Sequence, residues 1–463
     1  MINATIFREY DIRGVVKQDL DDATVEAVGK AIGTAMHRRG VSRLSVGRDV
    51  RLDSPHLQEV LIAGLTATGM EVVDVGQVPT PVQYFSILHL GLGGGVMVTG
   101  SHNPIEFNGF KISVHDPKMG LVSMYGPDIT HLAELIAKKD FAKGKGTVQR
   151  QDVLPAYVRT LKERFHFARR LKVVVDAGNG TAGPIAPQLW EDLGMEVVAL
   201  YCEPDGSFPH HLPDPTVPKY VVDLRKAVLA HQADVGVGYD GDADRIGGID
   251  NRGEIVFADR LLALFAKEVL AKRPGAPIVF DVKCSQALAE FITLHGGKPE
   301  MWKTGHSLLK ARMKELHAPL AGEMSGHMFF ADDYYGFDDA LYASGRLLQL
   351  VAADGRPLSE IVTEIPYFIS TPEIRVHCAD EAKFRVVREL VQRFKARYQV
   401  IDIDGARVLF GDGWGLVRAS NTQPVLVLRF EARTQPRLRE IIDLFTQELR
   451  RYPEVTFSEE DFA

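Results

Sequence analysis

Short runs of apolar residues alternate along most of the chain with longer amphipathic segments that end at glycine. Runs of the first kind are 44–50 (LSVGRDV), 70–76 (MEVVDVG) and 95–100 (GVMVTG), and segments of the second kind are 56–69 and 131–144. Short apolar runs predict buried strands, and longer amphipathic segments predict helices. Further apolar runs follow at 172–180, 195–201, 233–240, 278–283 and 299–305. This alternation predicts α/β layers built around parallel or mixed sheets.

The C-terminal part has a different pattern, in which several strands are joined by short turns. The expected order is a strand, a helix, three further strands and a final helix, at 370–380, 382–398, 399–410, 413–420, 424–433 and 436–451. This order predicts an α+β module. We place boundaries near residues 147, 252 and 367, which divides the chain into 1–147, 148–252, 253–367 and 368–463. Length alone, at about 150 residues per domain, suggests roughly three domains.

Composition and charge exclude several classes of protein. The 463 residues are 45% hydrophobic and 25% charged, which is typical of a folded chain. The net charge of −7 excludes a nucleic-acid-binding surface spread over the molecule but permits local basic pockets for small anions. The chain has no run of about 18 apolar residues, so we expect no membrane span. The N-terminus lacks a secretory pattern, and Cys202, Cys284 and Cys378 are far apart. We therefore expect free thiols in the cytoplasm.

The first candidate site is the loop Thr99–Pro104 (TGSHNP), which follows a buried strand. Gly100 permits a sharp turn that presents Ser101, although Ser, Asn and Pro are also ordinary turn residues. We expect the side chains of Ser101 and His102 to diverge, because they are adjacent in sequence. The GxSxG elbow of serine hydrolases is absent here. A nucleophilic Ser101 would therefore need another group to activate it or its leaving group.

The second candidate site is the loop that follows the strand at 233–239. Asp240, Asp242 and Asp244 occupy alternate positions, followed by Arg245. Three carboxylates so close together repel one another unless a cation is present, and such a loop can hold a hard ion such as Mg²⁺. The EF-hand pattern fails, because it needs Gly at the position of Arg245 and Glu at the position of Asn251. Arg245 is placed to contact a phosphate. A solvated acidic turn is the alternative.

Three more polar loops are candidates for ligand binding, and each is alternatively a surface turn. They are Lys303–Ser307 (KTGHS), Gly322–His327 (GEMSGH) and Arg418–Pro424 (RASNTQP). Glu323 and Ser325 are spaced to clamp sugar hydroxyls. The third loop combines a guanidinium, hydroxyls and an amide, which suits a phosphate dianion. Histidines in such loops, here His306 and His327, more often form structural hydrogen bonds than act as acids or bases.

Residues 178–183 (GNGTAG) match the G-x-G-x-x-G fingerprint of dinucleotide-binding enzymes. The loop follows a strand, and Glu203 lies twenty residues beyond it. Two residues count against a nicotinamide-dependent dehydrogenase. Asp176 occupies a strand end that is normally apolar, and Pro184 changes the entry into the next helix. A tight strand-to-helix turn is the simpler interpretation.

The order of these motifs resembles that of the α-D-phosphohexomutase superfamily. The resemblance covers the whole chain and includes YDIRG at 10–14. The chain is more similar to the bacterial bifunctional phosphomannomutase/phosphoglucomutase branch than to the phosphoglucosamine mutases, whose serine loop usually has the sequence TASHNP. Ala243 departs from the family, which usually has glycine there. Its methyl group would fit if φ is negative, whereas a positive φ would strain the acidic loop.

The resemblance implies a four-domain, heart-shaped molecule of three similar α/β domains and a C-terminal α+β domain. Each domain would deliver one loop to a central cleft: the phosphoserine, metal-binding, sugar-binding and phosphate-binding loops, in that order. Phospho-Ser101 would convert hexose 6-phosphates and hexose 1-phosphates of mannose and glucose into one another, through a hexose 1,6-bisphosphate that reorients. The implied cofactors are one Mg²⁺ and glucose 1,6-bisphosphate as activator. The partners would be small hexose phosphates, and the chain would be a monomer.

The resemblance also assigns roles to individual residues. The metal would be held by Asp240, Asp242, Asp244 and Ser101. Lys111 is the first candidate for general acid or base and His306 the second. The catalytic candidates are Ser101, Lys111, His306, Arg13, His102 and Arg245. The substrate-binding candidates are Tyr10, Lys283, Thr304, Gly305, His306, Glu323, Ser325, His327, Arg418, Ser420, Asn421 and Thr422. Phosphoglucosamine mutase, a nicotinamide-dependent dehydrogenase and a catalytically silent paralogue are the alternative functions.

Overall fold

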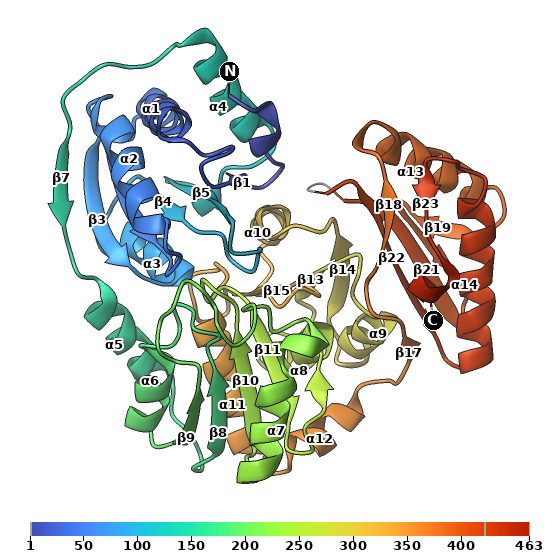
Figure 1. Ribbon diagram of the computed structural model, residues 1–463. Helices are drawn as coiled ribbons and strands as arrows, with labels where there is room; N and C mark the ends of the chain where they lie inside the picture. Colours follow the sequence, from blue (N-terminus) through green and yellow to red (C-terminus); the bar gives the residue numbers. More distant parts are fainter. Residues whose placement is uncertain (1, 421–422, 463) are drawn as a thin grey trace.

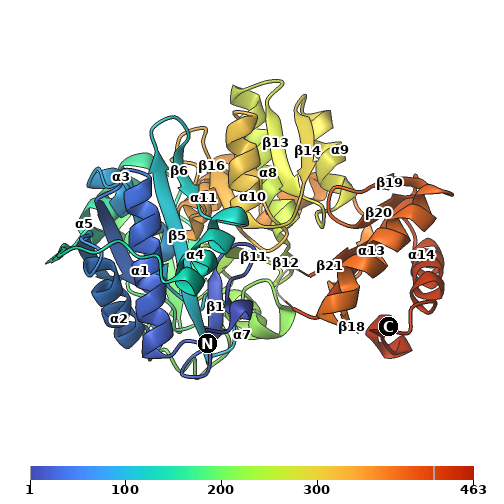
Figure 2. The same cartoon turned by 90° about the horizontal axis from the view of Figure 1, so that it is seen from above.

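The computed structural model describes residues 2–420 and 423–462 and contains four separate sheets (Figure 1). Each sheet is formed by one continuous part of the chain, and the four units follow one another in an arc. The first and fourth units face each other across a gap in Figure 1, and the second and third units connect them. Figure 2 shows the third unit between them when the molecule is seen from above.

The first unit is a mixed sheet with helices on both sides. Its strands are β1 (Ile12–Val15), β2 (Arg43–Arg48), β3 (Glu71–Gln77), β4 (Gly94–Val98), β5 (Phe107–Asp116), β6 (Gly120–Ser123) and β7 (Thr147–Arg150). The order is β1-β5-β4-β2-β3-β7, with β6 beside β5. Its helices are α1 (Asp22–Arg38), α2 (Ser54–Thr66), α3 (Thr80–His89) and α4 (Pro127–Lys138). Helices α1 and α2 can approach closely because Gly29 has no side chain. A Cβ on this residue would lie only 2.5 Å from the carbonyl oxygen of Leu61.

The second and third units are also mixed sheets, and they share one apolar core. The second has the order β12-β11-β10-β8-β9 and the third β14-β13-β15-β16. The strands are β8 (Lys172–Asp176), β9 (Glu196–Leu200), β10 (Val235–Tyr239), β11 (Ile246–Asp250), β12 (Ile255–Val256), β13 (Pro277–Asp281), β14 (Lys298–Trp302), β15 (Leu320–Gly322) and β16 (Met328–Phe330). The helices are α5 (Leu154–Arg164), α6 (Ala186–Asp192), α7 (Val222–His231), α8 (Ala258–Lys272), α9 (Gln286–Leu294), α10 (His306–Glu315), α11 (Ala340–Asp354) and α12 (Leu358–Ile361).

The shared core explains how the first three units are held together. It includes Phe85 of α3, Tyr157 of α5, Val235 of β10, Leu261 of α8 and Leu341 of α11, all almost fully buried. Helix α11 is buried along most of its length and contacts both β10 and β11. Burial of this much apolar surface is the main stabilising contribution to the arrangement. It fixes the loops at the strand ends of the three units relative to one another.

The fourth unit is an antiparallel sheet with the order β19-β20-β21-β22-β18-β23, and β17 pairs with β22. Its strands are β17 (Ile369–Ser370), β18 (Ile374–Cys378), β19 (Gln399–Ile401), β20 (Ala406–Leu409), β21 (Gly413–Ala419), β22 (Val425–Ala432) and β23 (Val455–Thr456). Helices α13 (Asp380–Lys395) and α14 (Gln435–Leu449) pack on it around Phe430 and Phe445. The unit contacts the third one through side chains such as Arg407, which donates to the carbonyl oxygens of Val282 and Cys284 at 2.6 and 2.7 Å.

The predicted α/β layers and the C-terminal α+β module are confirmed. Strand β2 is parallel to β3 and β4, whereas β5 is antiparallel to β4, so the sheets are mixed. The helix expected at 131–144 is different, because α4 begins at Pro127 and ends at Lys138. The next residue, Lys139, has a left-handed φ of 52°. Gly144 instead packs against the backbone of Gly69. Within the described residues, no helix is long and apolar enough to cross a membrane.

Candidate active site

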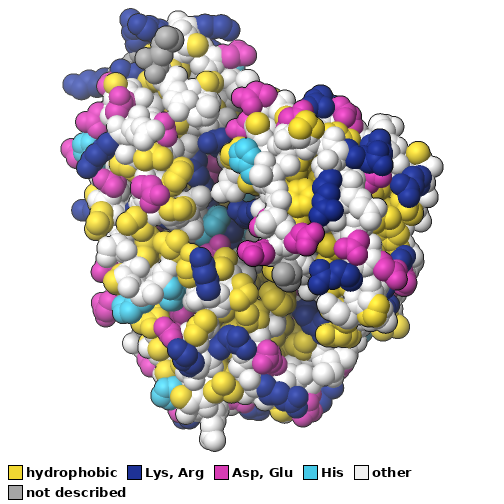
Figure 3. All heavy atoms as spheres, turned by 45° about the vertical axis from the view of Figure 1, so that its right-hand side comes forward, with side chains coloured by type: hydrophobic (Ala, Val, Ile, Leu, Met, Phe, Trp, Pro, Cys, Tyr) yellow, Lys and Arg dark blue, Asp and Glu magenta, His cyan; other side chains and the backbone are white. Residues whose placement is uncertain are grey.

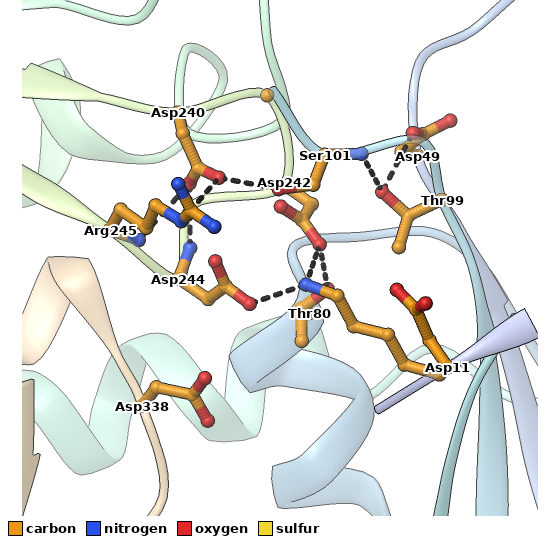
Figure 4. A network of polar contacts seen from close by, with 12 residues as sticks. Asp11, Asp49, Thr80, Thr99, Ser101, Asp240, Asp242, Asp244, Arg245 and Asp338 are labelled. Carbon is orange, nitrogen blue, oxygen red and sulfur yellow. Dashed lines mark hydrogen bonds and ion pairs between the residues drawn. The ribbon is translucent and has the colours of Figure 1, made fainter. Parts of the chain in front are cut away.

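Ser101 lies at the carboxyl end of β4, in a serine loop that we define as residues 99–107. Its side chain is buried, and its Oγ donates to Asp240 Oδ2 at 2.8 Å (Figure 4). Its amide donates to Thr99 Oγ1 at 2.8 Å, and Thr99 in turn donates to Asp49 Oδ2 at 2.8 Å. Ser101 has a φ of 47°, in the left-handed region that non-glycine residues rarely adopt. The loop thus aims the hydroxyl at the acidic residues of the second unit.

The expectation that Ser101 and His102 diverge is wrong. Ser101 Oγ and His102 Nδ1 are 3.1 Å apart. The left-handed backbone at Ser101 bends the chain so that both side chains lie on the same side of the loop. Burial, together with the nearby guanidiniums of Arg245 and Arg13, holds the pKa of His102 well below its usual value. A neutral imidazole therefore lies against the serine hydroxyl.

Asp240, Asp242 and Asp244 follow β10 in an acidic loop that we define as residues 240–245. All three are fully buried, and one carboxylate oxygen from each lies within 4.8 Å of the others. Lys111 Nζ, from β5, lies 2.7 Å from Asp242 Oδ2 and 2.5 Å from Asp244 Oδ2. Thr80 Oγ1, at the start of α3, donates to Asp242 Oδ2 at 2.6 Å. The first unit therefore supplies the cation and the hydroxyl that hold the acidic loop of the second.

The acidic loop carries more negative charge than its neighbours neutralise. Burial and repulsion from Asp244 and Asp242 raise the pKa of Asp240 well above its ordinary value. Burial opposes ionisation of Asp242, but the Lys111 ammonium outweighs it and lowers the pKa of that carboxyl. Burial would also lower the pKa of Lys111, but the two carboxylates raise it overall. Among the described residues, Asp242 Oδ1 and Asp244 Oδ1 are buried without a hydrogen-bond partner. These free oxygens fit a divalent metal ion.

Ala243 has a positive φ of 58°, so the backbone of the acidic loop is strained at this residue. Such a conformation costs an alanine roughly 1–2 kcal/mol relative to the right-handed region. Two backbone hydrogen bonds hold it there. Its amide donates to Asp240 O at 3.1 Å, and its carbonyl accepts from the amide of Ala340, at the start of α11, at 3.1 Å.

Arg245 is oriented by a histidine of the third unit. Its Nε donates to His327 Nε2 at 3.0 Å and lies 4.0 Å from Asp240 Oδ2. A guanidinium can only donate, so the imidazole accepts at Nε2 and carries its proton on Nδ1. That nitrogen lies 3.0 Å from Asp338 Oδ2 and 3.6 Å from Asp244 Oδ1. Asp244, His327 and Asp338 are close enough to hold a metal. A proton on Nδ1 would occupy the side of the imidazole that faces the two carboxylates, so a close contact with Asp338 describes this group better than a metal site.

The third unit brings its two predicted loops together near the first unit. The amide of Gly305 donates to Glu323 Oε1 at 2.9 Å, and Ser325 Oγ donates to Glu323 Oε2 at 2.5 Å. The hydroxyl of Tyr10 donates to the carbonyl of Thr304 at 2.7 Å. Gly305 must be glycine here, because its φ is 136° and a Cβ would lie 2.5 Å from the Tyr10 ring.

His306 and Arg13 also border the site. His306 Nδ1 lies 3.7 Å from Asp338 Oδ2. Burial and the nearby Lys310 hold the pKa of His306 well below its usual value. Arg13, on β1, pairs with Asp11 at 2.6 Å. His306 thus offers a second neutral imidazole.

Candidates of the fourth unit form a separate group around Asp404. Asp404 Oδ2 accepts from Arg418 Nε at 2.9 Å and from the amide of Thr304 at 3.1 Å, so it links the third and fourth units. Ser420 Oγ accepts from the amide of Gln423 at 3.1 Å. Lys283 pairs with Glu373 at 3.0 Å. Asn421 and Thr422 lie outside the described residues.

A cavity of about 1040 Å³ lies between the third and fourth units. Its lining includes Lys303, Thr304 and Asp404, together with side chains of α13. Figure 3 shows the molecule hollowed between its two lobes, with basic and histidine side chains in the depth of the hollow. Asp404 lines this cavity, whereas Ser101 and the acidic loop do not.

The glycine-rich loop at 178–183 supports the acidic loop. The amide and the hydroxyl of Thr181 both donate to the carbonyl of Gly241, at 3.0 and 3.1 Å. A Cβ on Gly180 would lie 2.8 Å from the same oxygen, which explains the glycine there. Gly183 packs in the same way against the backbone of Cys202. These contacts support the tight turn rather than a dinucleotide site.

Several residues of the site escape sequence reasoning. Asp49, Arg51, Thr80 and Asp338 contact candidate residues or their loops, and Lys310 pairs with Asp338. Asp49 lies near the end of the predicted strand 44–50, Arg51 follows that strand, and Asp338 precedes a helix, so each resembles an ordinary strand-end, turn or capping residue. Their partners lie far away in sequence, so local patterns carry no signal for them.

Comparison with known proteins matches all four units to one family. The models for phosphoglucomutase/phosphomannomutase alpha/beta/alpha domains I, II and III match residues 4–125, 155–253 and 257–368. The model for the C-terminal domain of the same family matches residues 373–448.

Individual relatives match over nearly the whole chain. A phosphomannomutase/phosphoglucomutase of Pseudomonas aeruginosa is 48% identical over 448 residues, which is 96% of each chain. A phosphoglucomutase of Neisseria gonorrhoeae is 43% identical over 96% of each chain. The crystal structure of a phosphoglucomutase/phosphomannomutase family protein from Burkholderia thailandensis has a TM-score of 0.90 at 42% identity, covering 97% of this chain and 98% of that one. The motifs, the four-unit fold and these matches agree, and the chain belongs to the phosphoglucomutase/phosphomannomutase family.

Proposed function

We propose that the chain is an isomerase that interconverts hexose 6-phosphates and hexose 1-phosphates of glucose and mannose, with Ser101 as the phosphoryl carrier. The names of its relatives support the activity. The contact between Ser101 Oγ and Asp240 Oδ2, at 2.8 Å, carries the assignment of the carrier. It places a buried hydroxyl beside an acidic loop, where a phosphoryl group and a metal ion would meet.

Asp240, Asp242 and Asp244 would hold Mg²⁺, together with an oxygen of Ser101 or of its phosphate. The two unpartnered carboxylate oxygens support this assignment. When bound, Mg²⁺ would act as a Lewis acid that stabilises the charge of the transferring phosphoryl group. Arg245, fixed by His327, lies beside the same position and would add a fixed positive charge.

In the first half-reaction, the free hydroxyl of the hexose phosphate attacks the phosphorus of phospho-Ser101. A new bond forms between the sugar oxygen and phosphorus as the bond from Ser101 Oγ to phosphorus breaks. The sugar hydroxyl loses a proton, and Ser101 Oγ gains one. His102, whose Nδ1 lies 3.1 Å from this Oγ, is neutral because its pKa is held low, so it would orient the oxygen by a hydrogen bond and not act as the acid.

Lys111, the first candidate for the general acid or base, is better suited to stabilise negative charge than to accept a proton. Its ammonium is bound between Asp242 and Asp244, which keeps it charged. A charged ammonium stabilises negative charge and cannot accept a proton. His306, with a lowered pKa, is therefore the better candidate for the base that receives the proton of the sugar hydroxyl.

In the second half-reaction, the hexose 1,6-bisphosphate turns over and its other phosphoryl group returns to Ser101. Glu323 and Ser325 would hold ring hydroxyls that both orientations share. Arg418 and Ser420 would hold the phosphate that does not react, with Asn421 and Thr422 as further predicted contacts. Arg13, Tyr10 and Lys283 remain proposed phosphate and substrate contacts.

Intact-protein mass spectrometry tests the proposal. Incubation with glucose 1,6-bisphosphate and Mg²⁺ should add one phosphoryl mass that maps to Ser101. Ser101→Ala should take up none and lose turnover by several orders of magnitude, because the covalent step is removed. Label at another residue, or an active Ser101→Ala, would contradict the proposal. Turnover of glucosamine phosphate above that of glucose and mannose phosphates would favour a phosphoglucosamine mutase.

We also propose that one chain is sufficient for activity, as a monomer in the cytoplasm. Its three cysteines are free, as a reducing compartment allows. Sedimentation at the concentration of the assay, with the active species at the mass of one chain, tests the first point.

A further inference from the structure

The segment that follows β2 carries two buried charges that the reaction described above does not use. Asp49 and Arg51 expose only 1% and 2% of their surface. Arg51 Nε lies 3.5 Å from Asp49 Oδ2, so the two charges offset each other. Buried charges of this kind are costly unless hydrogen bonds satisfy them. Their partners therefore indicate what they do.

The guanidinium of Arg51 is surrounded by carbonyl oxygens of the serine loop. It donates to the carbonyls of Ser101 at 3.0 Å, Asn103 at 2.5 Å, Pro104 at 2.7 Å and Phe107 at 3.0 Å. Arginine is suited to this because its donors form a rigid planar fork. The loop lies so close that a Cβ on Gly100 would be 2.2 Å from Arg51 Nε.

Asp49 holds the other side of the same serine. Its Oδ2 accepts from Thr99 Oγ1 at 2.8 Å and from the amide of Gly100 at 3.0 Å. Thr99 Oγ1 accepts in turn from the amide of Ser101. Both peptide groups of Ser101 are thus connected to one short segment, through Thr99 on the N–H side and directly on the C=O side.

This arrangement explains how Ser101 keeps its unusual backbone. A φ of 47° is unfavourable for serine and persists only when the surroundings determine it. The conformation brings Ser101 Oγ to Asp240 and to His102. The second unit covers the segment from behind: the Arg51 guanidinium lies 5.3 Å from the centre of the Phe208 ring, and a Cβ on Gly206 would lie 2.4 Å from Val50 O.

We propose that Arg51, together with Asp49, is a positioning residue that holds Ser101 in the left-handed conformation required for phosphoryl transfer. Arg51 acts on the backbone of the serine loop and does not touch the reacting atoms. The inference rests on the proposed role of Ser101 as phosphoryl carrier. A lysine at position 51 would keep the charge but cannot reach four carbonyl oxygens in a plane.

The experiment follows the rate at which glucose 1,6-bisphosphate phosphorylates Ser101 in Arg51→Lys and Arg51→Ala. A loop displaced by about 1 Å is expected to lower this rate by about 100-fold in each variant. The KM for the hexose phosphate should stay near that of the wild type, because the proposed sugar and phosphate contacts lie elsewhere. Added guanidinium ion should restore part of the rate in Arg51→Ala, and methylammonium should not.

Arg48→Ala is the matched control. Arg48 is at the end of the same strand, but its Nη1 bonds to Gln77 Oε1 at 3.0 Å and to Asp49 O at 3.3 Å, away from the serine loop. Its rate should stay near that of the wild type. Thermal unfolding of each variant gives the folded fraction, by which every rate is corrected.

Two results would overturn the inference. Arg51 variants that lose thermal stability but phosphorylate Ser101 at the wild-type rate per folded molecule would show a purely structural role. A wild-type chain that takes up no label at Ser101 would overturn the proposed function itself, and the inference with it. The label on the wild type therefore distinguishes the two failures.

Discussion

Two residues that both contact Asp240 have backbone conformations that L-amino acids rarely adopt. Ser101 and Ala243 have φ values of 47° and 58°. Both are buried and both hydrogen-bond with Asp240, Ser101 through its hydroxyl and Ala243 through its amide. Local strain of this kind is retained where surrounding contacts enforce it, as at functional sites.

Substitutions at Ala243 test this strain. Glycine should relieve roughly 1 kcal/mol of it while losing a buried methyl group worth about 0.8 kcal/mol. The free energy of unfolding should therefore stay within about 1 kcal/mol of the wild type. Ala243→Val adds a β-branched side chain and should cost about 2 kcal/mol or more. Urea denaturation measures both, and a valine variant as stable as the wild type would contradict a left-handed residue 243.

At the scale of elements, the site depends on contacts in the third unit that connect α10, the loop of His327 and the N-terminal end of α11. Asp338, just before α11, accepts from Lys310 of α10 at 3.0 Å and lies 3.0 Å from His327 Nδ1. Burial alone would raise the pKa of Asp338, but Lys310 and His327 hold it well below its ordinary value. The helices thereby fix the imidazole that orients Arg245.

Asp338→Asn separates the two roles of this carboxylate. It leaves the buried Lys310 ammonium without a counter-charge, which should cost about 3 kcal/mol of stability. It also removes the negative charge that lies 3.0 Å from His327 Nδ1, so kcat should fall. Adding Lys310→Met should restore stability but leave kcat low. If the double variant regains both stability and kcat, Asp338 serves only to neutralise Lys310.

The sequence predicts some of these features and not others, for physical reasons. Strands, helices and the order of the polar loops follow from local periodicity, and so they were predictable. The contact between Ser101 and His102 was not, because it depends on a φ angle that sequence does not reveal. Arg51 was missed because its partner Ser101 is 50 residues away. Asp338 was missed in the same way, since its role requires the fold to bring His327 and Lys310 together.

At the scale of the whole molecule, buried arginines of the fourth unit join it to the third. Arg407 is fully buried, donates to the carbonyls of Val282 and Cys284, and lies 3.7 Å from the centre of the Trp414 ring. Burial lowers its pKa to about 10. The neighbouring Arg429 donates to the carbonyl of Lys283 at 2.6 Å. The net charge of −7 therefore hides local positive charge where the units meet.

Arg407→Met should loosen this junction. Each lost charge-assisted hydrogen bond is worth about 1.5–3 kcal/mol. The fourth unit should then shift away from the third, which would displace Arg418 and raise KM more than it lowers kcat. Small-angle scattering should show a larger radius of gyration. The control is Arg397→Met, because Arg397 lies exposed in the turn after α13 and pairs with Glu448. Unchanged scattering and KM in Arg407→Met would contradict this role.

The bonds that reach the six-residue acidic loop have a consequence for the order in which the chain is made. Ser101 and Thr80 contact it from the first unit, Thr181 from the second, and Ala340 and His327 from the third. Domains generally fold as units from the N-terminus during synthesis. The serine is therefore made early but acquires its complete surroundings only after Ala340 has left the ribosome. A nascent chain would remain unreactive toward sugar phosphates until about three quarters of it exists.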